Sequence, residues 1–276
     1  MLSGGGRTKG AKRGDRPGLP LVSVVTVVYN GAATLERTIQ SVLGQSYGNI
    51  EYIIVDGGST DGTLDLIKRY DDRLDLWVSG KDKGIYDAMN KGIGSCTGQW
   101  VGLINADDWY EPDTVQRVVD LANSRSHTNV IHGEIWLHYP NGQRTLKKAK
   151  ISGFLLKYWE MVFNHPSFFV RRSFYEGRPF DTALKVSADH KWTYEAYRDA
   201  SETFAYIPAP LANFTVGGAS MSVPLKKVLA EGRAVCRDLG MGPLETSLGL
   251  LVRTVLYPAQ HLKLWINQYL LPKGGK

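Results

Sequence analysis

The sequence predicts an α/β protein with a mostly parallel β-sheet between two layers of helices. Two observations carry this prediction. From Val22 to about residue 128, short apolar runs rich in β-branched residues alternate with amphipathic helical stretches, which is the rhythm of βαβ units. The runs contain few polar residues, as expected of parallel strands that are buried on both faces. The 276 residues are 43% hydrophobic and 22% charged, a composition typical of a soluble globular protein.

Four strands are expected in the first half of the chain. Helices are expected between them because apolar residues recur at helical spacing, as at Leu35, Ile39 and Val42. Pro112 suits the first position of a further helix, where its missing N–H is not needed. The expected strands are Val22–Asn30, Tyr52–Asp56, Leu74–Val78 and Trp100–Ile104.

The pattern changes after about Asn129. Two apolar stretches joined at Asn141-Gly142 predict a β-hairpin, because this dipeptide readily adopts the tight turn that hairpins need. The other expected elements are a helix over Ser187–Ala200, a strand over Thr203–Ile207, and a helical C-terminus over the last fifty residues with breaks at residues 240–243 and at Pro258.

Charge is unevenly distributed along the chain. The formal net charge is +6, with +4 over residues 1–20 and +5 over residues 222–276, which leaves the middle mildly acidic. We expect residues 1–20 to form a disordered basic tail. An acidic middle argues against nucleic acid as a partner, whereas the basic ends would suit an anionic membrane surface.

Neither a disulfide framework nor a zinc site is expected, because Cys96 and Cys236 lie far apart and outside any Cys/His cluster. The first twenty residues lack the apolar run of a secretory signal. The longest apolar stretch, near the C-terminus, carries too many polar residues to span a bilayer. We therefore expect a cytoplasmic protein, peripheral on the inner face of the cell membrane where its basic ends meet lipid.

Three of the four expected strands end in polar or acidic residues, at Tyr29-Asn30, at Asp56 to Ser59 and at Asn105 to Asp108. The carboxyl ends of parallel strands meet at one edge of a sheet, where ligands bind. A strand-end Asp can simply cap the next helix, but acids at several strand ends favour a ligand site. The absence of a G-x-x-x-x-G-K-[ST] motif excludes a P-loop NTPase, and no G-x-G-x-x-G follows the first strand, which makes a dinucleotide site a poor fit.

These strand-end residues suit a nucleotide diphosphate held through a metal ion. An aromatic ring such as Tyr29 can pack near a base, and a carboxylate such as Asp56 can accept a hydrogen bond from its N–H. Mg²⁺ and Mn²⁺ prefer carboxylate and phosphate oxygens, so Asp107 and Asp108 could hold one of these ions against a diphosphate.

Three motifs occur in order: VSVVTVVYNGAATLERTIQSVLGQSYGNIEYIIVDGGSTDGTLDLI, DKGIYDAMNKGI and GLINADDW. Together they closely resemble glycosyltransferase family 2, inverting enzymes of the GT-A fold, a Rossmann-like αβα sandwich. The second motif resembles the subgroup that builds bacterial capsule and exopolysaccharide units, including the colanic acid transferases. The resemblance covers roughly Leu21 to Ser220. It implies a GT-A domain over residues 21–221, with the nucleotide-sugar half to about residue 128 and the acceptor half after it, followed by a helical extension over residues 222–276.

The resemblance assigns donor-binding residues. Asp56 matches the acid that contacts the base, and Gly57 stands where many members have a second acid. Asp107 and Asp108 match the D-x-D-type motif, with Asp108 as the direct metal ligand and Asp107 nearer the ribose. Gly80 stands where the subgroup often has Glu. Also expected at the nucleotide-sugar are Tyr29, Asn30, Ser59, Asp82, Gly84 and Asn90.

The catalytic base is expected on the acceptor side. The segment Val186–Trp192 resembles the family's acidic segment before an aromatic residue, which implies Asp189 as the base, although its residue type alone would favour a helix cap. His165 is expected to contact acceptor or phosphate. Trp192 is expected to stack on a sugar, with core packing as the alternative. The loop over Phe214–Met221 resembles one that closes on the acceptor side over the bound donor.

The resemblance implies transfer of a sugar, with inversion and with Mg²⁺ or Mn²⁺, from a UDP- or GDP-linked donor to a hydroxyl of a saccharide, lipid-linked, in bacterial polysaccharide biosynthesis. The C-terminal helices either pack on the domain or lie on the membrane interface. Two alternatives stay open. A sugar-phosphate nucleotidyltransferase shares a similar core, but YNGAATLERT lacks its Gly-rich basic loop. A non-catalytic nucleotide-sugar-binding partner in a polysaccharide assembly complex is the other.

Overall fold

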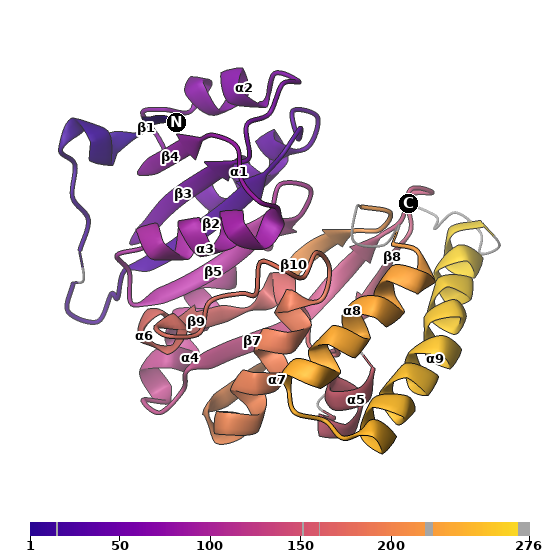
Figure 1. The fold of residues 1–276 in the computed structure, drawn as a ribbon. Coiled ribbons are helices and arrows are strands. Elements are labelled where there is room, and N and C mark those ends of the chain that lie inside the picture. The colour runs from indigo at the N-terminus through magenta and orange to yellow at the C-terminus, as the bar shows by residue number, and fades with distance from the viewer. Residues whose placement is uncertain (15, 151, 160, 219–222, 270–276) are drawn as a thin grey trace.

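One mixed sheet of ten strands runs through the part of the chain that the computed structural model describes, residues 1–14, 16–150, 152–159, 161–218 and 223–269. The order across the sheet is β1-β4-β3-β2-β5-β9-β7-β10-β6, and β8 pairs with β7 (Figure 1). The strands are β1 (Leu2–Gly4), β2 (Val22–Val28), β3 (Ile50–Asp56), β4 (Leu76–Ser79), β5 (Trp100–Asn105), β6 (Trp109–Tyr110), β7 (Val130–His138), β8 (Arg144–Lys147), β9 (Phe169–Arg171) and β10 (Phe204–Thr215).

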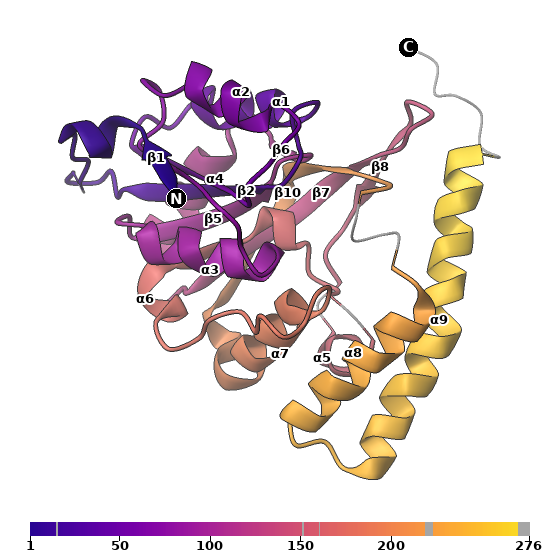
Figure 2. The same cartoon turned by 45° about the horizontal axis from the view of Figure 1, so that its top comes forward.

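Helices cover both faces of this sheet, and Figure 2 shows α1 and α2 above it with α3 and α7 below. Ile53 and Ile54 of β3 are both fully buried, and they belong to the cores on opposite faces. This explains the uninterrupted apolar runs, because a central parallel strand needs apolar residues on both sides. One layer holds α1 (Leu35–Leu43), α2 (Thr63–Arg69) and α4 (Thr114–Ser124), and the other holds α3 (Ile85–Ser95), α5 (Gly153–Tyr158), α6 (Arg172–Tyr175), α7 (Ala188–Ala200) and α8 (Leu225–Asp238). Short 3-10 turns lie at Gly6–Lys9, His165–Ser167 and Ser201–Thr203.

The four central strands of the first half are parallel, as the sequence predicts. Asp56 at the end of β3 is level with Val28 of β2 and Ser79 of β4, and Asn105 of β5 is level with Val27. Their carboxyl ends therefore reach the same edge of the sheet. The antiparallel pairs are made by β1, β6, β8 and β9.

The second half confirms the predicted hairpin and helix but lengthens the predicted strand. Asn141-Gly142 lies between β7 and β8, and α7 matches the expected helix. The strand expected to end at Ile207 continues to Thr215 as β10, parallel to β7. The register shifts around Pro210. Proline has no N–H to donate to a neighbouring strand, so the strand continues through Pro210 with a local irregularity in its pairing. The proline therefore looks like the end of the strand in the sequence.

The C-terminal extension is a pair of packed helices, α8 and α9 (Pro243–Tyr269). The predicted break at residues 240–243 is confirmed, and Gly240 ends the first helix with a left-handed backbone (φ 69°). The predicted break at Pro258 is wrong, because α9 runs through it. Proline removes one helical hydrogen bond there, and the side of the helix on which it lies is exposed.

The prediction of a disordered basic tail is also wrong. β1 pairs with β4 and forms the edge of the sheet. Basic side chains of this segment, which the sequence shows only as a charged run, form ion pairs with acidic residues of the domain. Arg7 lies 3.2 Å from the buried Glu51, and Arg13 lies 2.5 Å from Asp75. The domain boundary expected at residue 221 lies outside the described residues.

Candidate active site

The ends of β2 and β3 are cross-linked into one corner. The Asn30 N–H donates to Ser59 Oγ at 2.7 Å, and Asn30 Oδ1 accepts from the Thr60 N–H at 2.9 Å. Asn30 holds a left-handed backbone (φ 50°), which asparagine tolerates better than most residues. Tyr29 is 67% exposed beside this corner, so its ring is open to a ligand. The structure thus brings Tyr29, Asn30 and Ser59 together.

Asp56 is buried beneath this corner and organises it. Its Oδ1 accepts from Ser59 Oγ at 2.5 Å, and its Oδ2 accepts from Ser79 Oγ at 2.6 Å. The residue is 1% exposed. A carboxylate offers about four acceptor positions, and the Ser59 N–H uses a further one at 3.2 Å. Asp56 therefore has little capacity left for a base.

Asp82 lies over Gly57 and is the more open carboxylate. A Cβ at residue 57 would come within 2.6 Å of Asp82 Oδ2 and within 3.4 Å of the Tyr29 ring. Asp82 Oδ1 accepts from the Gly84 N–H at 2.9 Å. The space that a side chain at residue 57 would fill is occupied by a carboxylate from the loop before α3. Residue 57 is a glycine and not a second acid, and the Asp82 carboxylate lies in the space next to it.

Asp107 and Asp108 follow β5 and are held by α1 and β10. Asp108 Oδ1 accepts from the Thr215 N–H at 3.0 Å, and the Asp108 carbonyl accepts from Thr38 Oγ1 at 2.6 Å. Thr215 Oγ1 donates to the Asp107 carbonyl at 2.6 Å. The last residue of β10 therefore ties both acids into the second half of the sheet.

Arg37 of α1 reaches the backbone of this acid pair rather than its carboxylates. It donates to the Asp107 carbonyl at 3.0 Å, and its guanidinium lies 3.5 Å from the Trp109 ring centroid. Burial lowers the pKa of Arg37, and the charges of Asp108 and Asp107 only partly offset this. Burial raises the pKa of Asp107, and burial together with the Asp107 charge raises the pKa of Asp108 well above its ordinary value. Ionising the pair therefore costs stability as the pH rises, and a bound cation would recover it.

The oxygen atoms around the acid pair fit a divalent cation. Asn105 Oδ1 and Asp108 Oδ2 are buried and have no hydrogen-bond partner among the described residues. With the half-buried Asp107 carboxylate, they form a set of oxygens of the kind that Mg²⁺ and Mn²⁺ prefer. Across the described ranges, no group of three or more His, Cys, Asp or Glu side chains could hold a metal by itself. A cation here would therefore take its remaining ligands from a diphosphate and water.

The two acids lie at different depths. Asp108 is 0% exposed and its Oδ1 is bound by Thr215, whereas Asp107 is half-buried. A ligand arriving from solvent therefore meets Asp107 first. Asp107 is therefore the more accessible of the two carboxylates.

Asp189 occupies the first turn of α7 and faces α3. Its Oδ1 accepts from Tyr86 Oη at 2.9 Å and from the His190 N–H at 2.9 Å. Burial and the Asp189 charge raise the pKa of Tyr86 well above its ordinary value, so Tyr86 stays protonated and donates. Lys185 Nζ donates to the Lys83 carbonyl at 2.9 Å, which ties the segment before α7 to the loop before α3. Asp189 is thereby placed beside the rim, by which we mean the edge of the sheet that the carboxyl ends of β2 to β5 reach.

His165 and Trp192 differ from each other in placement. His165 Nε2 is buried and has no hydrogen-bond partner within the described part of the chain. Burial lowers the pKa of His165, and the charge of Asp189 opposes this. The prediction of a sugar-stacking platform at Trp192 is wrong. Trp192 is 3% exposed, and its Nε1 donates to the Arg178 carbonyl at 2.8 Å, so it belongs to the core.

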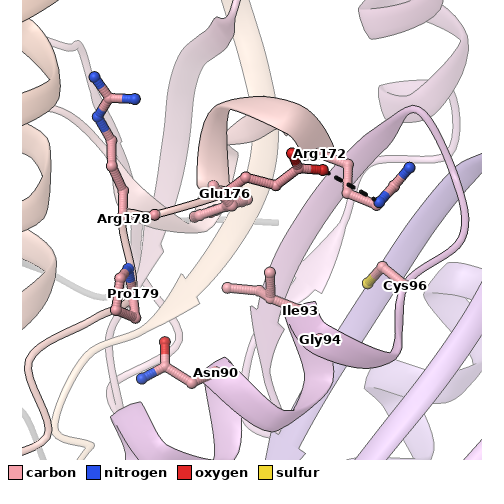
Figure 3. A pocket seen from close by; sticks show the side chains of 10 residues that line it. Asn90, Ile93, Gly94, Cys96, Arg172, Glu176, Arg178 and Pro179 are labelled. Atoms are coloured by element: carbon pink, nitrogen blue, oxygen red, sulfur yellow. Dashed lines mark ion pairs between the residues drawn. The ribbon is translucent and has the colours of Figure 1, made fainter.

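Asn90 is also placed differently from the prediction. Its Nδ2 donates to the Phe180 carbonyl at 2.8 Å, and its Oδ1 accepts from the Phe180 N–H at 2.9 Å. Both ends of the amide thus pin the loop before α7 and are not presented to a sugar-diphosphate. Asn90 lines a pocket of about 400 Å³ with Cys96 and Arg172 (Figure 3). Because Arg172 donates to the Gly98 carbonyl just before β5, this pocket lies towards the amino ends of the strands, away from the rim.

Arg37 and Lys185 are site residues that the sequence analysis does not single out. Arg37 sits within an ordinary amphipathic helix, and Lys185 is 102 residues from the Lys83 that it contacts, so neither has a local signal. Asn105 belongs to the polar strand end that the sequence shows before the acid pair, but the sequence assigns it no role of its own.

Comparisons with known proteins agree with this geometry. Residues 23–177, more than half of the chain, match the family described as Glycosyl transferase family 2. A PGL/p-HBAD biosynthesis glycosyltransferase of Mycobacterium bovis is 27% identical over 251 residues, which cover 86% of this chain and 90% of the relative.

Solved structures show the same fold at low identity. Residues 1–349 of S. aureus TarS, in complex with UDP-GlcNAc, superpose with a TM-score of 0.65 at 17% identity, covering 90% of this chain and 73% of that one. In a further TarS crystal structure, this chain spans 43% of the TarS chain. The mannosyltransferase PcManGT of Pyrobaculum calidifontis, in complex with GDP-Man and Mn²⁺, gives 0.59 at 18% identity, covering 91% and 70%. Acidic residues lie at the carboxyl ends of the parallel strands, and the family match covers more than half of the chain. This chain belongs to glycosyltransferase family 2 and has the GT-A fold.

Proposed function

We propose that this glycosyltransferase moves a sugar, with inversion, from a UDP- or GDP-linked donor to a hydroxyl of a lipid-linked saccharide in bacterial polysaccharide biosynthesis. One observation carries the proposal: an exposed aromatic ring, an open carboxylate, an acid pair and a further carboxylate, Asp189, lie along the same edge of the sheet. Relatives of the same fold have been solved with UDP-GlcNAc and with GDP-Man, which supports a nucleotide-sugar donor.

The donor lies across the ends of β2, β3 and β4. The base packs near Tyr29, with Asp82 as the open carboxylate, and Asp56 supports the corner through the hydrogen bonds that it accepts from Ser59 and Ser79. Asn30 and Ser59 shape this corner. The diphosphate faces Gly84 at the start of α3, because the N-terminus of a helix of this length favours negative charge.

The acid pair fits a Mg²⁺ or Mn²⁺ ion held by Asp107, with Asp108 and Asn105 behind it. When bound, such an ion would offset the charge of the diphosphate as it departs. Arg37 keeps the pair in place through the Asp107 carbonyl and the Trp109 ring.

Asp189 acts as the general base of a single displacement. The acceptor hydroxyl oxygen attacks the anomeric carbon from the face opposite the diphosphate, and its proton passes to Asp189. The bond to the diphosphate oxygen breaks and its electron pair leaves with that group, which inverts the configuration. Tyr86 and the His190 N–H both hold Oδ1, so the carboxylate has a fixed direction. His165, whose buried Nε2 has no hydrogen-bond partner among the described residues, contacts the acceptor.

Thermal unfolding with UDP, GDP, CDP and dTDP, each with and without Mn²⁺, tests the donor site. One diphosphate at 100 times its Kd should stabilise the fold by about 2.7 kcal/mol, seen as a rise in Tm that depends on Mn²⁺. A folded protein that responds to none of the four would contradict a nucleotide-diphosphate site, both in the proposed enzyme and in a non-catalytic nucleotide-sugar-binding partner. Stabilisation by nucleoside triphosphates in preference to diphosphates would instead favour a nucleotidyltransferase.

A continuous apolar stripe lies on the solvent side of α9, and it supports peripheral membrane binding. Within the described residues, no helix is long and apolar enough to cross a bilayer. The stripe residues share one face of a helix about 40 Å long, with steps of three or four residues up to Val255 and the exposed Pro258 between Val255 and Leu262. They are 36% to 87% exposed, and they are Leu244, Leu248, Leu251, Val255, Leu262, Trp265, Ile266 and Tyr269. Exposed basic residues accompany them on α8 and α9: Lys226, Lys227, Arg233, Arg237 and Lys263. We propose that this stripe lies in the interface of an anionic membrane surface.

Replacing Leu251 and Leu262 together with glutamine should weaken binding to phosphatidylglycerol vesicles about 30-fold. The two side chains are 60% and 58% exposed, and moving them into lipid contributes about 2 kcal/mol in total. Co-sedimentation measures the bound fraction. The matched control is Leu2→Gln with Leu19→Gln, because these leucines are 54% and 44% exposed away from α9. Unchanged sedimentation of the α9 variant, or a stripe covered by a second copy in a stable dimer, would contradict membrane binding.

A further inference from the structure

The C-terminal helices reach the segment that carries Asp189. Glu231 of α8 accepts two hydrogen bonds from consecutive backbone groups, from the Lys185 N–H to Oε1 at 2.9 Å and from the Val186 N–H to Oε2 at 2.9 Å. The N-cap residue of α7, Ser187, makes no side-chain cap hydrogen bond of its own. Glu231 therefore holds the chain at the point where it enters the first turn of α7.

A second contact from α8 lies just after Asp189. Lys191 Nζ of α7 is 2.9 Å from Asp181 Oδ2 and 2.9 Å from Asp238 Oδ2 of α8. The Lys191 side chain is only 14% exposed, so this bridge is screened less by salt than a surface ion pair. Through Glu231 and Asp238, α8 thus holds the chain on both sides of Asp189.

The same segment is joined to the donor side of the site. Lys185, whose N–H is bound by Glu231, donates from Nζ to the Lys83 carbonyl at 2.9 Å. Lys83 lies in the loop before α3, between Asp82 and Gly84. One residue therefore connects α8, the segment that carries Asp189 and the proposed donor loop.

α8 is in turn fixed against α9, and Figure 1 shows α8 lying between α7 and α9. A Cβ at Gly232 would come within 2.9 Å of Arg253 Cδ, so only glycine permits this close approach of the two helices. Arg253 is 4% exposed, and its Nη1 donates to the Tyr158 carbonyl of α5 at 3.0 Å. Because Glu231 is the neighbour of Gly232, the packing of the helix pair sets where its carboxylate lies.

We propose that Glu231 of α8 is a positioning residue for sugar transfer, acting on the segment that carries Asp189. A general base works only within hydrogen-bonding distance of the proton that it takes, and a small misplacement lowers the rate steeply. The direction of the Asp189 side chain depends on the first turn of α7, and Glu231 holds the chain that enters that turn. The inference rests on the proposed role of Asp189 as the base.

The test compares Glu231→Ala with Glu245→Ala in the full chain. Glu245 lies on α9 and pairs with Lys157 of α5 at 2.5 Å, so its loss removes an acid from the same helix pair without touching the Asp189 segment. The assay follows release of UDP from UDP-GlcNAc and of GDP from GDP-mannose with Mn²⁺, with water and with octyl glycosides as acceptors. Glu231→Ala should lower kcat about tenfold while the KM for the donor stays within about twofold. Glu245→Ala should leave both constants unchanged.

Repeating the change in an Asp189→Asn background separates positioning from a general loss of structure. Because Glu231 acts through Asp189, Glu231→Ala should add less than about a twofold loss there. A further tenfold loss, or an unchanged kcat for Glu231→Ala alone, would overturn the proposal. If Asp189→Asn itself leaves kcat unchanged, the proposed base is wrong, an outcome distinct from failure of Glu231 alone. If the alanine variant does not fold, Glu231→Gln, which keeps one carbonyl acceptor, is measured in its place and should also lower kcat.

Discussion

Replacing Asp189 with asparagine should lower kcat about 10³-fold, while the affinity for the donor diphosphate stays within about twofold. Asparagine has the same shape and keeps an oxygen that can accept from Tyr86 Oη, so the first turn of α7 should be preserved. It cannot take the proton of the acceptor hydroxyl. Release of UDP or GDP from the donor, measured beside the thermal shift with the diphosphate alone, separates the two effects.

The matched control is Asp199→Asn on the same helix. Asp199 lies in the last turn of α7 and is 2.9 Å from Arg198, far along the helix from Asp189. The same change of one oxygen there should leave kcat unaltered. A variant Asp189→Asn that keeps more than about a tenth of the wild-type rate would exclude Asp189 as the base, because general bases contribute at least about 100-fold.

Replacing Asp107 with asparagine should remove the Mn²⁺-dependent part of the stabilisation by diphosphate. Asp107 is the half-buried acid on the open side of the pair, so losing its charge should weaken diphosphate binding with Mn²⁺ by about tenfold or more. The measurement is the rise in Tm with the diphosphate, with and without Mn²⁺. Unchanged binding without Mn²⁺ would show that the base and ribose contacts are intact.

Replacing Asp108 with asparagine should instead stabilise the metal-free protein. Asp108 is fully buried, with a pKa raised by burial and by the charge of Asp107, so its ionised form destabilises the fold at pH 8. An asparagine oxygen can still accept from the Thr215 N–H. We expect Tm to rise by about 2–4 °C, or ~1 kcal/mol. The gain should shrink as the pH falls towards the ordinary carboxyl range, because the folded protein then keeps Asp108 protonated.

The two variants together decide which acid is the direct metal contact. Loss of the Mn²⁺ effect in Asp108→Asn, with the effect kept in Asp107→Asn, would restore the order expected from the sequence. It would also show that the depth of Asp108 is no barrier to a ligand.

The parts of the site that could be predicted are those with a local signal. Asp56 and the Asp107-Asp108 pair stand at the ends of apolar runs, and parallel strands bring such ends to one edge. The hairpin at Asn141-Gly142 has an equally local cause in its turn. In each case, neighbouring residues along the chain determine the structure.

The parts that could not be predicted depend on partners far away in sequence. Arg7 looks like part of a solvated basic run, but its partner Glu51 is 44 residues away. Trp192 could be a sugar platform or a core residue, and only the packing of α6 and the following loop on α7 decides for the core. The relative depth of Asp107 and Asp108 depends on Thr215, the last residue of β10, and the prolines inside β10 make the sequence look as if the strand ended before it.

The return of β10 to the acid pair has a consequence for how the protein is made. Asp108 accepts from the N–H of Thr215, which lies 107 residues later. A chain emerging from the ribosome folds from its N-terminus, so the first parallel strands can form while Asp108 still lacks this donor. The acid pair reaches its final geometry only when β10 has been translated and has added to the edge beside β7. The nascent first half, which contains every strand-end acid, is therefore not yet a finished donor site.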